Sequence, residues 1–204
     1  MLKIFRICAI GALVSMSALS AFAQVHLDHL PQSDKVPDEF VAVIEIPQGS
    51  NVKYEIDKES GLIFVDRFQS MPVVYPANYG SVPSSLAGDG DPLDVIVYTR
   101  SPIMPGAAIK VRPIGMLKMI DGGETDDKIV AVPTSKIDPT YDTIKELKDL
   151  PEIEVLRLEQ FFAIYKNLPE GRKKVELNGF EDAAAARIAI KTAVDAYKEK
   201  NTAH

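Results

Sequence analysis

The chain has almost no cysteine and very little histidine, and both shortages exclude kinds of chemistry. Cys8 is the only cysteine among 204 residues, and the three histidines are His26, His29 and His204. Because Cys8 falls in an apolar N-terminal stretch, the rest of the chain offers no disulfide, no thiolate nucleophile and no thiolate metal site. No histidine lies inside the main body of the sequence to serve as general base or metal ligand. Catalysis would therefore depend on Asp, Glu, Lys, Arg, Tyr or a metal ion.

Positive charge and long apolar stretches are also scarce. Lys and Arg number 23 against 29 Asp and Glu, so the formal net charge is −6. An acidic protein is a poor candidate for binding nucleic acid or an anionic membrane, and neither is expected as a partner. No expected helix is apolar enough on all sides to be a membrane element, and the sequence has no internal repeat.

The N-terminus has the pattern of an export signal. Lys3 and Arg6 precede a mostly apolar stretch, residues 7–19, and Ala21-Phe22-Ala23 has the small-x-small form of a cleavage site. This predicts a cleavable signal peptide over residues 1–23 and a periplasmic or secreted protein. The alternative, an uncleaved anchor, is disfavoured because a membrane span needs about 20 apolar residues. Loss of the two basic residues would take the formal charge from −6 to −8.

The order of apolar patterns along the chain predicts one domain of the α+β class. Residues 24–37 are polar with two prolines and are expected to form a leader segment, followed by a single domain over 38–204. Strands are expected at 40–46, 52–57, 62–67, 94–99, 107–120 (broken by Pro113 and Gly115) and 128–132. Strands clustered early and helices late favour a small barrel or curled sheet with flanking helices.

Two helices are expected after the strands. In residues 152–168 the spacing places four side chains on roughly one side: Leu156, Phe161, Phe162 and Tyr165. In residues 181–198 the residues at helical spacing are Ala186, Ile190, Ala193 and Tyr197. Asn178 or Gly179 is expected to open this last helix.

The most informative stretch is Gly88-Asp89-Gly90-Asp91-Pro92-Leu93-Asp94, directly before an apolar run. Three carboxylates within six residues repel one another, so a chain that keeps them together usually neutralises them with cations. Aspartate oxygens suit Mg²⁺, Ca²⁺ or Mn²⁺. An EF-hand loop is excluded because Leu93, Asp94 and Arg100 stand at its positions 5, 6 and 12. A solvated turn remains the alternative for this stretch taken alone.

A second acidic loop, residues 121–128, joins two expected strands. Alone it resembles a solvated hairpin tip. If both acidic loops met at one end of a barrel, they could hold two or more divalent ions about 4 Å apart. Cationic and phenolic side chains that could bind phosphate are also present: Lys53, Arg67, Lys128, Lys166, Tyr75, Tyr79 and Tyr165. Each has an ordinary structural explanation, and only the set suggests a site.

Together these segments resemble the family I soluble inorganic pyrophosphatases of the bacterial type. The resemblance covers about residues 36–198. It is carried by Val43-Ile44-Glu45-Ile46-Pro47, Lys53-Tyr54-Glu55-Ile56-Asp57-Lys58, Asp66-Arg67, Tyr75-Pro76-Ala77-Asn78-Tyr79-Gly80, Asp89-Gly90-Asp91-Pro92-Leu93-Asp94, Asp121 with Asp126 and Lys128, and Phe161-Phe162 with Tyr165-Lys166. The resemblance implies a five-stranded, OB-like β-barrel with flanking helices.

The resemblance also implies a role for each matching residue. Metal ligands would be Asp89, Asp94 and Asp126 for activating Mg²⁺, Asp121 for a substrate-borne Mg²⁺, and Glu45 directly or through water. Asp91 would accept a proton from water, and Glu55 would support the metal shell. The phosphate-binding residues would be Lys53, Arg67, Lys128, Tyr79, Tyr165 and Lys166, with Tyr75 nearby.

The leading hypothesis is therefore Mg²⁺-dependent hydrolysis of pyrophosphate to two orthophosphates by a metal-activated water, with no covalent intermediate. Mn²⁺ or Zn²⁺ are possible substitutes for Mg²⁺. The alternatives are a non-catalytic protein that binds divalent cations or phosphate on the same fold, and a broader phosphohydrolase. The resemblance further implies a homo-oligomer, a hexamer in many bacterial members. The signal peptide departs from a family whose typical members are cytoplasmic.

Overall fold

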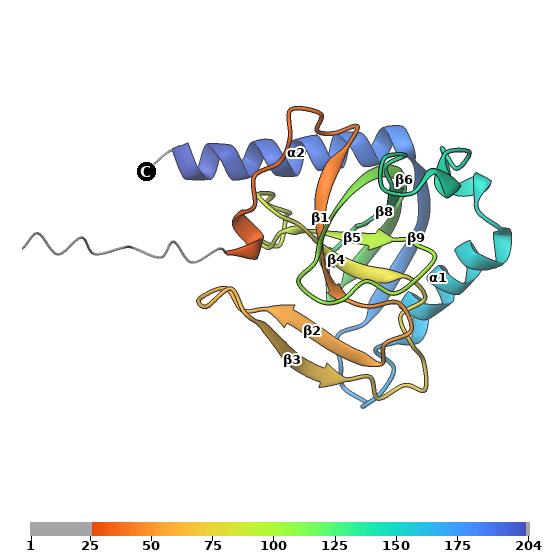
Figure 1. Cartoon of the computed structure of the whole chain (residues 1–204). Coiled ribbons are helices and arrows are strands. Elements are labelled where there is room, and N and C mark those ends of the chain that lie inside the picture. Colours follow the sequence, from red (N-terminus) through yellow and green to blue (C-terminus); the bar gives the residue numbers. More distant parts are fainter. Residues whose placement is uncertain (1–25, 203–204) are drawn as a thin grey trace, which may run out of the picture.

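In the computed structural model, residues 26–202 are described, and they form a closed ring of strands with two helices (Figure 1). The predicted signal peptide lies outside the described residues. The strands are β1 (Phe40–Ile46), β2 (Val52–Ile56), β3 (Ile63–Phe68), β4 (Asn78–Val82), β5 (Leu93–Val97), β6 (Ala108–Asp121), β7 (Glu124–Thr125), β8 (Lys128–Pro133) and β9 (Val175–Asp182). The α-helices are α1 (Glu152–Ile164) and α2 (Ala183–Thr202), and short 3₁₀ turns cover Leu27–His29, Pro139–Tyr141 and Leu147–Asp149.

The ring follows the order β1-β4-β5-β8-β6 and closes because β6 also pairs with β1. Only β5 and β8 run parallel among the five; every other pairing in the ring is antiparallel. Strands β7 and β9 each pair antiparallel with β6, while β2 and β3 form a separate hairpin beside the barrel. This confirms the predicted α+β class and the five-stranded, OB-like barrel in a single domain.

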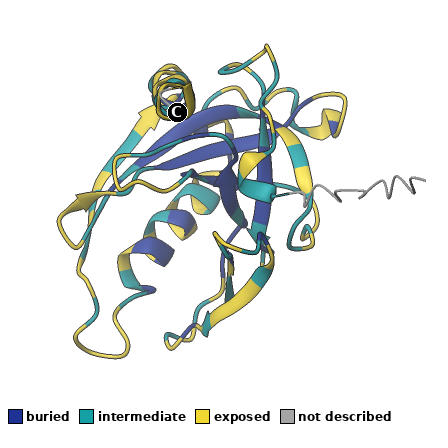
Figure 2. Cartoon of the chain, turned by 90° about the vertical axis from the view of Figure 1, so that its left-hand side faces the viewer, coloured by how far each residue is buried: buried dark blue, intermediate teal, exposed yellow. Residues whose placement is uncertain are grey.

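Side chains at alternate positions of the strands pack into two hydrophobic clusters, one on each face of the sheet. Along β5, Ile96 belongs to one cluster, whereas Val95 and Val97 belong to the other. Helix α1 adds aromatic residues to the first cluster, and α2 adds Ala186, Ile190, Ala193 and Val194 to the second. Figure 2 shows the ring largely buried and the outer faces of the helices exposed. Each helix therefore stabilises one face of the same sheet.

Strand β4 was not predicted, because its sequence Asn-Tyr-Gly-Ser-Val is poor in residues that favour strands. Its position depends on tertiary contacts. A Cβ on Gly80 would lie 1.9 Å from the carbonyl oxygen of Val43, so only glycine lets β4 approach β1. The buried Asn78 amide accepts from the N–H of Gln48 (3.1 Å) and Ile103 (2.8 Å) and donates to the Val97 oxygen and Thr99.

The expected start of the last helix was wrong. Asn178 and Gly179 lie inside β9, where Gly179 has φ +81°, a conformation that a strand adopts at a bulge. Helix α2 begins at Ala183, and the Asp182 carboxylate accepts a hydrogen bond from the N–H of Ala185 (2.9 Å), as an N-cap does. A strand thus separates the two helices that the sequence suggested were consecutive.

Other boundaries shifted less. Strand β6 continues through the expected break, with a register shift between Pro113 and Gly115. Helix α1 ends at Ile164 rather than 168, and Leu156, expected on its buried side, is 43% exposed, whereas Leu158 is fully buried. Within residues 26–202, no helix has the length and apolarity that crossing a membrane would require.

Candidate active site

One open cavity of about 400 Å³ lies between the ring, the β2–β3 hairpin and the end of α1. All fourteen residues assigned to the site from the sequence line it: Glu45, Lys53, Glu55, Arg67, Tyr75, Tyr79, Asp89, Asp91, Asp94, Asp121, Asp126, Lys128, Tyr165 and Lys166. These residues come from segments spread along the chain from position 45 to position 166. The expectation that the two acidic loops converge is confirmed by this shared cavity.

The floor of the cavity is a row of polar residues across neighbouring strands. On β4, Ser81 lies opposite Asp94 of β5, and in the parallel pairing Asp94 lies beside Lys128 of β8. Glu45 stands at the register shift where β1 meets β4. Side chains at equivalent register positions point to the same face of a sheet, so pairing alone brings these groups together.

Lys128 lies between two carboxylates and is only 2% exposed. Its ammonium donates to both Asp94 and Asp126. Burial lowers the Lys128 pKa, but the two carboxylates outweigh burial and raise it overall. Burial raises the pKa of Asp126, Lys128 opposes that effect, and Asp94 adds to it. Lys128 therefore stays charged and neutralises part of the carboxylate pair.

Glu45 has no comparable cation beside it. Its pKa rises to about 8, first because burial disfavours the carboxylate and then because Asp94 repels it. The nearby Ser81 side chain and the charge of Lys53 lower the Glu45 pKa, but they offset only part of this effect. The metal-free protein therefore holds Glu45 largely neutral at pH 7, and a bound cation would restore its charge.

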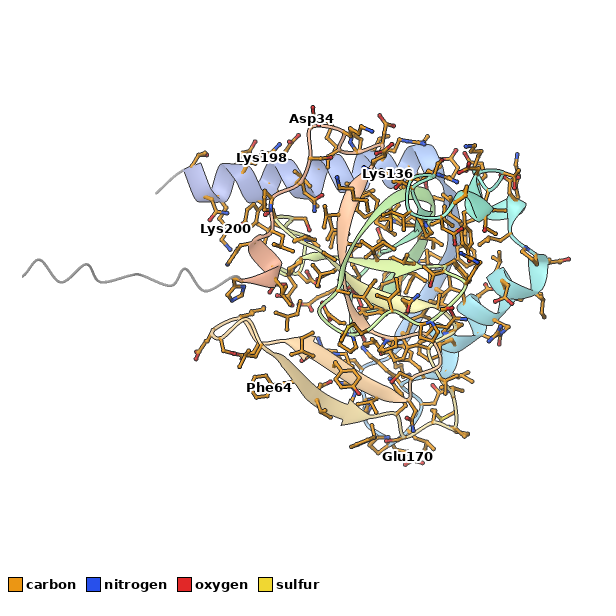
Figure 3. All side chains as sticks on the ribbon, in the orientation of Figure 1. Asp34, Phe64, Lys136, Glu170, Lys198 and Lys200 are labelled. Atoms are coloured by element: carbon orange, nitrogen blue, oxygen red, sulfur yellow. The ribbon has the colours of Figure 1, made fainter. Side chains whose placement is uncertain are left out.

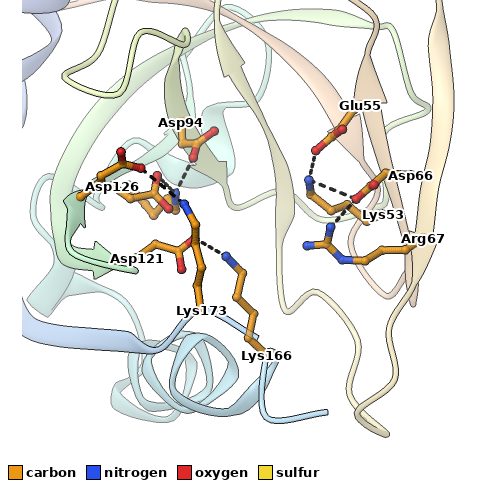
Figure 4. A network of polar contacts seen from close by, with 11 residues as sticks. Lys53, Glu55, Asp66, Arg67, Asp94, Asp121, Asp126, Lys166 and Lys173 are labelled. Atoms are coloured by element: carbon orange, nitrogen blue, oxygen red, sulfur yellow. Dashed lines mark hydrogen bonds and ion pairs between the residues drawn. The ribbon is translucent and has the colours of Figure 1, made fainter. Parts of the chain in front are cut away.

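The β2–β3 hairpin supplies a cationic wall facing that floor. Lys53 and Arg67 are directly paired across the two strands. Asp66 accepts from Arg67 (2.5 Å) and lies 3.3 Å from the Lys53 ammonium, which also donates to Glu55. Figure 4 shows this group on one side and the acidic groups around Asp94, Asp121 and Asp126 on the other.

The end of α1 supplies Tyr165 and Lys166. Lys166 donates to one oxygen of Asp121, while the other, Oδ1, is buried with no hydrogen-bond partner among the described residues. A buried carboxylate oxygen without a partner costs free energy unless a ligand satisfies it. Asp121 Oδ1 is therefore available to a cation that enters the cavity.

Three tyrosines form one aromatic group with the helix. The ring of Tyr75 lies 5.6 Å from that of Tyr79 and 4.7 Å from that of Phe161, which in turn lies 5.2 Å from Tyr165. Burial raises the pKa of each tyrosine, most strongly for Tyr79 and Tyr165, where cavity carboxylates add to the effect. The phenols consequently stay protonated and can donate hydrogen bonds to an anion.

Asp89 and Asp91 line the outer part of the cavity. The N–H of Asp91 donates to Asp89 Oδ1 at 3.1 Å, which fixes the loop. The Asp91 carboxylate is about half exposed and accepts from the ammonium of Lys58. This partner was not among the site residues expected from the sequence.

The sequence interpretation missed three polar residues of this cavity. They are Asp28, Lys58 and Ser81. Lys58 and Ser81 lie inside the segments that carried the family resemblance or directly beside them, so that signal was available. Asp28 belongs to the leader segment, and nothing in the linear sequence indicated that the leader reaches the cavity.

The donor set fits divalent metal ions. Eight carboxylates and five cationic side chains line the cavity, a formal excess of three negative charges. Neutral Glu45 and unpartnered Asp121 Oδ1 both favour an added cation. In residues 26–202 no three acidic or imidazole groups already converge as a ready metal site, since Lys128 lies between Asp94 and Asp126. A cation binding both carboxylates must therefore compete with Lys128.

Comparisons with known proteins agree on one family. The family model described as inorganic pyrophosphatase matches residues 42–198. The inorganic pyrophosphatase of Vibrio vulnificus is 48% identical over 84% of this chain and 96% of its own length, and that of Escherichia coli K12 is 46% identical over 84% and 98%. The crystal structure of inorganic pyrophosphatase from Thermus thermophilus superposes with a TM-score of 0.81 at 38% identity, covering 85% of this chain and 99% of that one. With this cavity on this fold, the chain belongs to the inorganic pyrophosphatase family, whose members are metal-dependent hydrolases.

Proposed function

We propose that this protein hydrolyses inorganic pyrophosphate to two orthophosphates with Mg²⁺ as the activating metal. The observation that carries the proposal is the single cavity in which carboxylates, cations and protonated tyrosines face one another. Pyrophosphate is a highly charged anion that an acidic cavity would repel. Hard divalent cations bound to the carboxylates would make the local charge of the cavity positive. The lysines, the arginine and the tyrosines would then bind the remaining phosphate oxygens.

The acidic floor would hold the metal ions. Asp89, Asp94 and Asp126 are the proposed ligands of activating Mg²⁺, with Asp121 for Mg²⁺ that arrives with the substrate. Glu45 would bind a metal directly or through water, supported by Glu55. When bound, Mg²⁺ acidifies a water and neutralises charge on the phosphates. Aspartate donors favour Mg²⁺, and Mn²⁺ or Zn²⁺ are proposed as substitutes.

The opposite wall would orient the substrate. Lys53 and Arg67 project from the hairpin and Lys166 from the end of α1, so they approach the cavity from two directions. Lys128, once displaced from Asp94 and Asp126, becomes free to bind a phosphate oxygen. Tyr79 and Tyr165 donate from their buried hydroxyls, and Tyr75 holds Tyr79 in place through ring contact. These cations stabilise the charge that develops as the bond between the phosphates breaks.

Asp91 is the proposed base. It stands in the loop that carries Asp89 and Asp94, its carboxylate is solvent-accessible, and within residues 26–202 that carboxylate accepts from Lys58. It would accept a proton from the attacking water, which then adds directly to phosphorus in line with the leaving phosphate. Neither thiol nor internal histidine is needed, so the reaction proceeds without a covalent intermediate.

The site of action and the assembly are proposed from other features. The N-terminal pattern Ala21-Phe22-Ala23 supports export to the periplasm or the medium. A homo-oligomer, on family resemblance a hexamer, is supported by apolar side chains on the surface: Phe64 is 55%, Phe68 65% and Ile153 61% exposed. Figure 3 shows Phe64 on the outer side of the hairpin. Sedimentation showing only monomer at micromolar concentration would contradict this assembly.

The test is orthophosphate release from pyrophosphate by the purified protein, with Mg²⁺ or with EDTA, beside the Asp91→Asn variant. We expect rapid release with Mg²⁺, none in EDTA, and a large loss of kcat in the variant, which keeps the shape of Asp91 but not the base. A folded, metal-loaded protein that releases no phosphate would favour the non-catalytic binding protein. Comparable activity on ATP would favour a broader phosphohydrolase.

A further inference from the structure

Ser81 is a buried serine on the floor of the cavity, and its hydroxyl has no partner. The residue belongs to β4, lines the cavity and is only 4% exposed. Within residues 26–202 its Oγ is buried and makes no hydrogen bond. A hydroxyl can both donate and accept, and a buried one that does neither costs free energy. Such a group is suited to a ligand that enters the cavity.

A second buried serine of the same segment shows how the chain satisfies such a group when it serves the fold. The Ser85 hydroxyl donates to the Val82 oxygen (2.6 Å) and accepts from the Leu93 N–H (2.8 Å). These two bonds hold the turn after β4 against the start of β5. In the described part of the chain Ser81 makes no bond of either kind, so its hydroxyl does not hold the backbone.

The strands on both sides of Ser81 place proposed metal ligands next to it. On β5 its register partner is Asp94, and the Cβ atoms of such cross-strand partners lie about 5 Å apart. On β1 its partner is Val43, two residues before Glu45. The Ser81 side chain is close enough to Glu45 to lower the pKa of that carboxyl. The hydroxyl is thus flanked by two carboxyl groups that are proposed to bind metal.

Asp94 has a different neighbour on its other side. In the parallel pairing it lies beside Lys128 of β8, whose ammonium donates to Asp94 Oδ2. Strand β8 therefore offers Asp94 a cation that competes with metal, whereas β4 offers a neutral oxygen. Hard cations such as Mg²⁺ bind neutral oxygens as well as carboxylates. A hydroxyl at this position adds a donor without adding negative charge to a cavity that is already acidic.

We propose that the Ser81 hydroxyl is a further metal ligand of this site, a neutral oxygen donor to the divalent cation that Asp94 binds. The inference rests on the proposed function, because it takes Asp94 as a ligand. It assigns a contact with the metal and no step of the reaction: Ser81 neither transfers a proton nor attacks phosphorus.

A ligand role and a structural role predict opposite effects of removing the hydroxyl. In the metal-free protein the hydroxyl is buried without a partner, so Ser81→Ala should leave the urea midpoint in EDTA unchanged or raise it. Mg²⁺ should then stabilise the variant less than the wild type, because a more weakly bound ligand shifts the folding equilibrium less. If the hydroxyl were needed to hold β4, the midpoint in EDTA would fall.

The test is calorimetric titration of the wild type, Ser81→Ala and Ser81→Cys with Mg²⁺ and with Cd²⁺. Loss of a group that supports a metal site costs about tenfold or more in affinity, so we expect Ser81→Ala to lower Mg²⁺ affinity at least about tenfold. Ser81→Cys keeps the shape of serine but offers sulfur, which hard Mg²⁺ avoids and soft Cd²⁺ prefers. It should bind Mg²⁺ as weakly as Ser81→Ala and bind Cd²⁺ more tightly than the wild type. Its ultraviolet Cd²⁺–thiolate absorption should exceed that of the wild type.

Val82→Ala is the matched control, since Val82 is the next residue of β4 and packs in the hydrophobic cluster on the other face of the sheet. It should lower the urea midpoint and leave Mg²⁺ affinity unchanged. The proposal is overturned if Ser81→Ala binds Mg²⁺ like the wild type, if its midpoint in EDTA falls as that of Val82→Ala does, or if Ser81→Cys gains no affinity for Cd²⁺. A wild type that binds Mg²⁺ but releases no phosphate from pyrophosphate overturns the proposed function alone, which distinguishes the two failures.

Discussion

Replacing Glu45 with glutamine should stabilise the metal-free protein while weakening metal binding. Burial and Asp94 raise the Glu45 pKa to about 8 in the folded state, against 4.5 for a free side chain. Between these pH values the folded state holds a proton that the unfolded state has released. The free energy of unfolding is therefore undiminished below pH 4.5 and falls as the pH rises, until the folded carboxyl has also ionised near pH 8.

The magnitude follows from the width of that interval. From pH 4.5 to 7 there are 2.5 units, each worth about 1.4 kcal/mol, so Glu45 destabilises the metal-free fold by at most about 3.5 kcal/mol at pH 7. Glutamine has nearly the same shape and never ionises. Glu45→Gln should therefore raise the free energy of unfolding by up to about 3.5 kcal/mol at pH 7 and leave it nearly unchanged at pH 4.

Urea unfolding in EDTA at several pH values measures the gain, and the same titration with Mg²⁺ measures what metal adds. Glu55→Gln is the matched control: its side chain is half exposed, so the free energy of unfolding should change by less than about 0.5 kcal/mol. Our reasoning about Glu45 would be refuted if Glu45→Gln were destabilising in EDTA at pH 7, or if Mg²⁺ stabilised it as much as the wild type.

Three further changes test the metal site, the barrel and a helix boundary. Asp94→Ala removes a proposed ligand and an acceptor of Lys128, so calorimetry should show Mg²⁺ affinity lowered at least about tenfold; unchanged affinity would mean that the ligand assignment is wrong. Gly80→Ala places a methyl group 1.9 Å from the Val43 oxygen and should lower the free energy of unfolding by about 3 kcal/mol in urea, whereas an unaffected midpoint would contradict the close approach of β4 to β1. Asp182→Ala removes the N-cap of α2 and should lower the free energy of unfolding by about 1 kcal/mol in urea. Asp182→Asn should largely avoid this loss, because asparagine also caps helices.

Runs of apolar and β-branched residues correctly predicted the strands whose own residues favour the extended conformation. The β-branched run at 40–46 and the apolar run at 128–132 became β1 and β8, with bounds within one residue. Strand β4 could not be predicted in this way, since its Asn, Gly and Ser are held by buried hydrogen bonds and close packing rather than by strand propensity. The Asn178-Gly179 pair was misread because glycine at positive φ serves a bulge as readily as a helix start.

The residues of the candidate site were predicted from the sequence more completely than the strands and helices were. Every residue named for it lines the cavity, because the motifs that carry the family resemblance keep the residue types that the chemistry needs. The roles of those residues remain predictions. The linear sequence did not indicate how the segments lie relative to one another: that Lys128 would lie between Asp94 and Asp126, or that Asp28 of the leader would line the cavity. Such contacts depend on how distant elements dock.

The pairing of β1 with β6 also determines when catalytic competence arises during folding. Phe40 pairs with Val111 and Val43 with Ala108, so closing the ring joins positions about 70 residues apart. Such long loops carry an entropic cost before their contacts form, and folds dominated by distant pairings fold slowly. The polar floor of the cavity spans β1, β4, β5 and β8, so no single hairpin or helix contains it whole. Recovery of hydrolysis during refolding would therefore report the closure of the barrel rather than the formation of any one hairpin or helix.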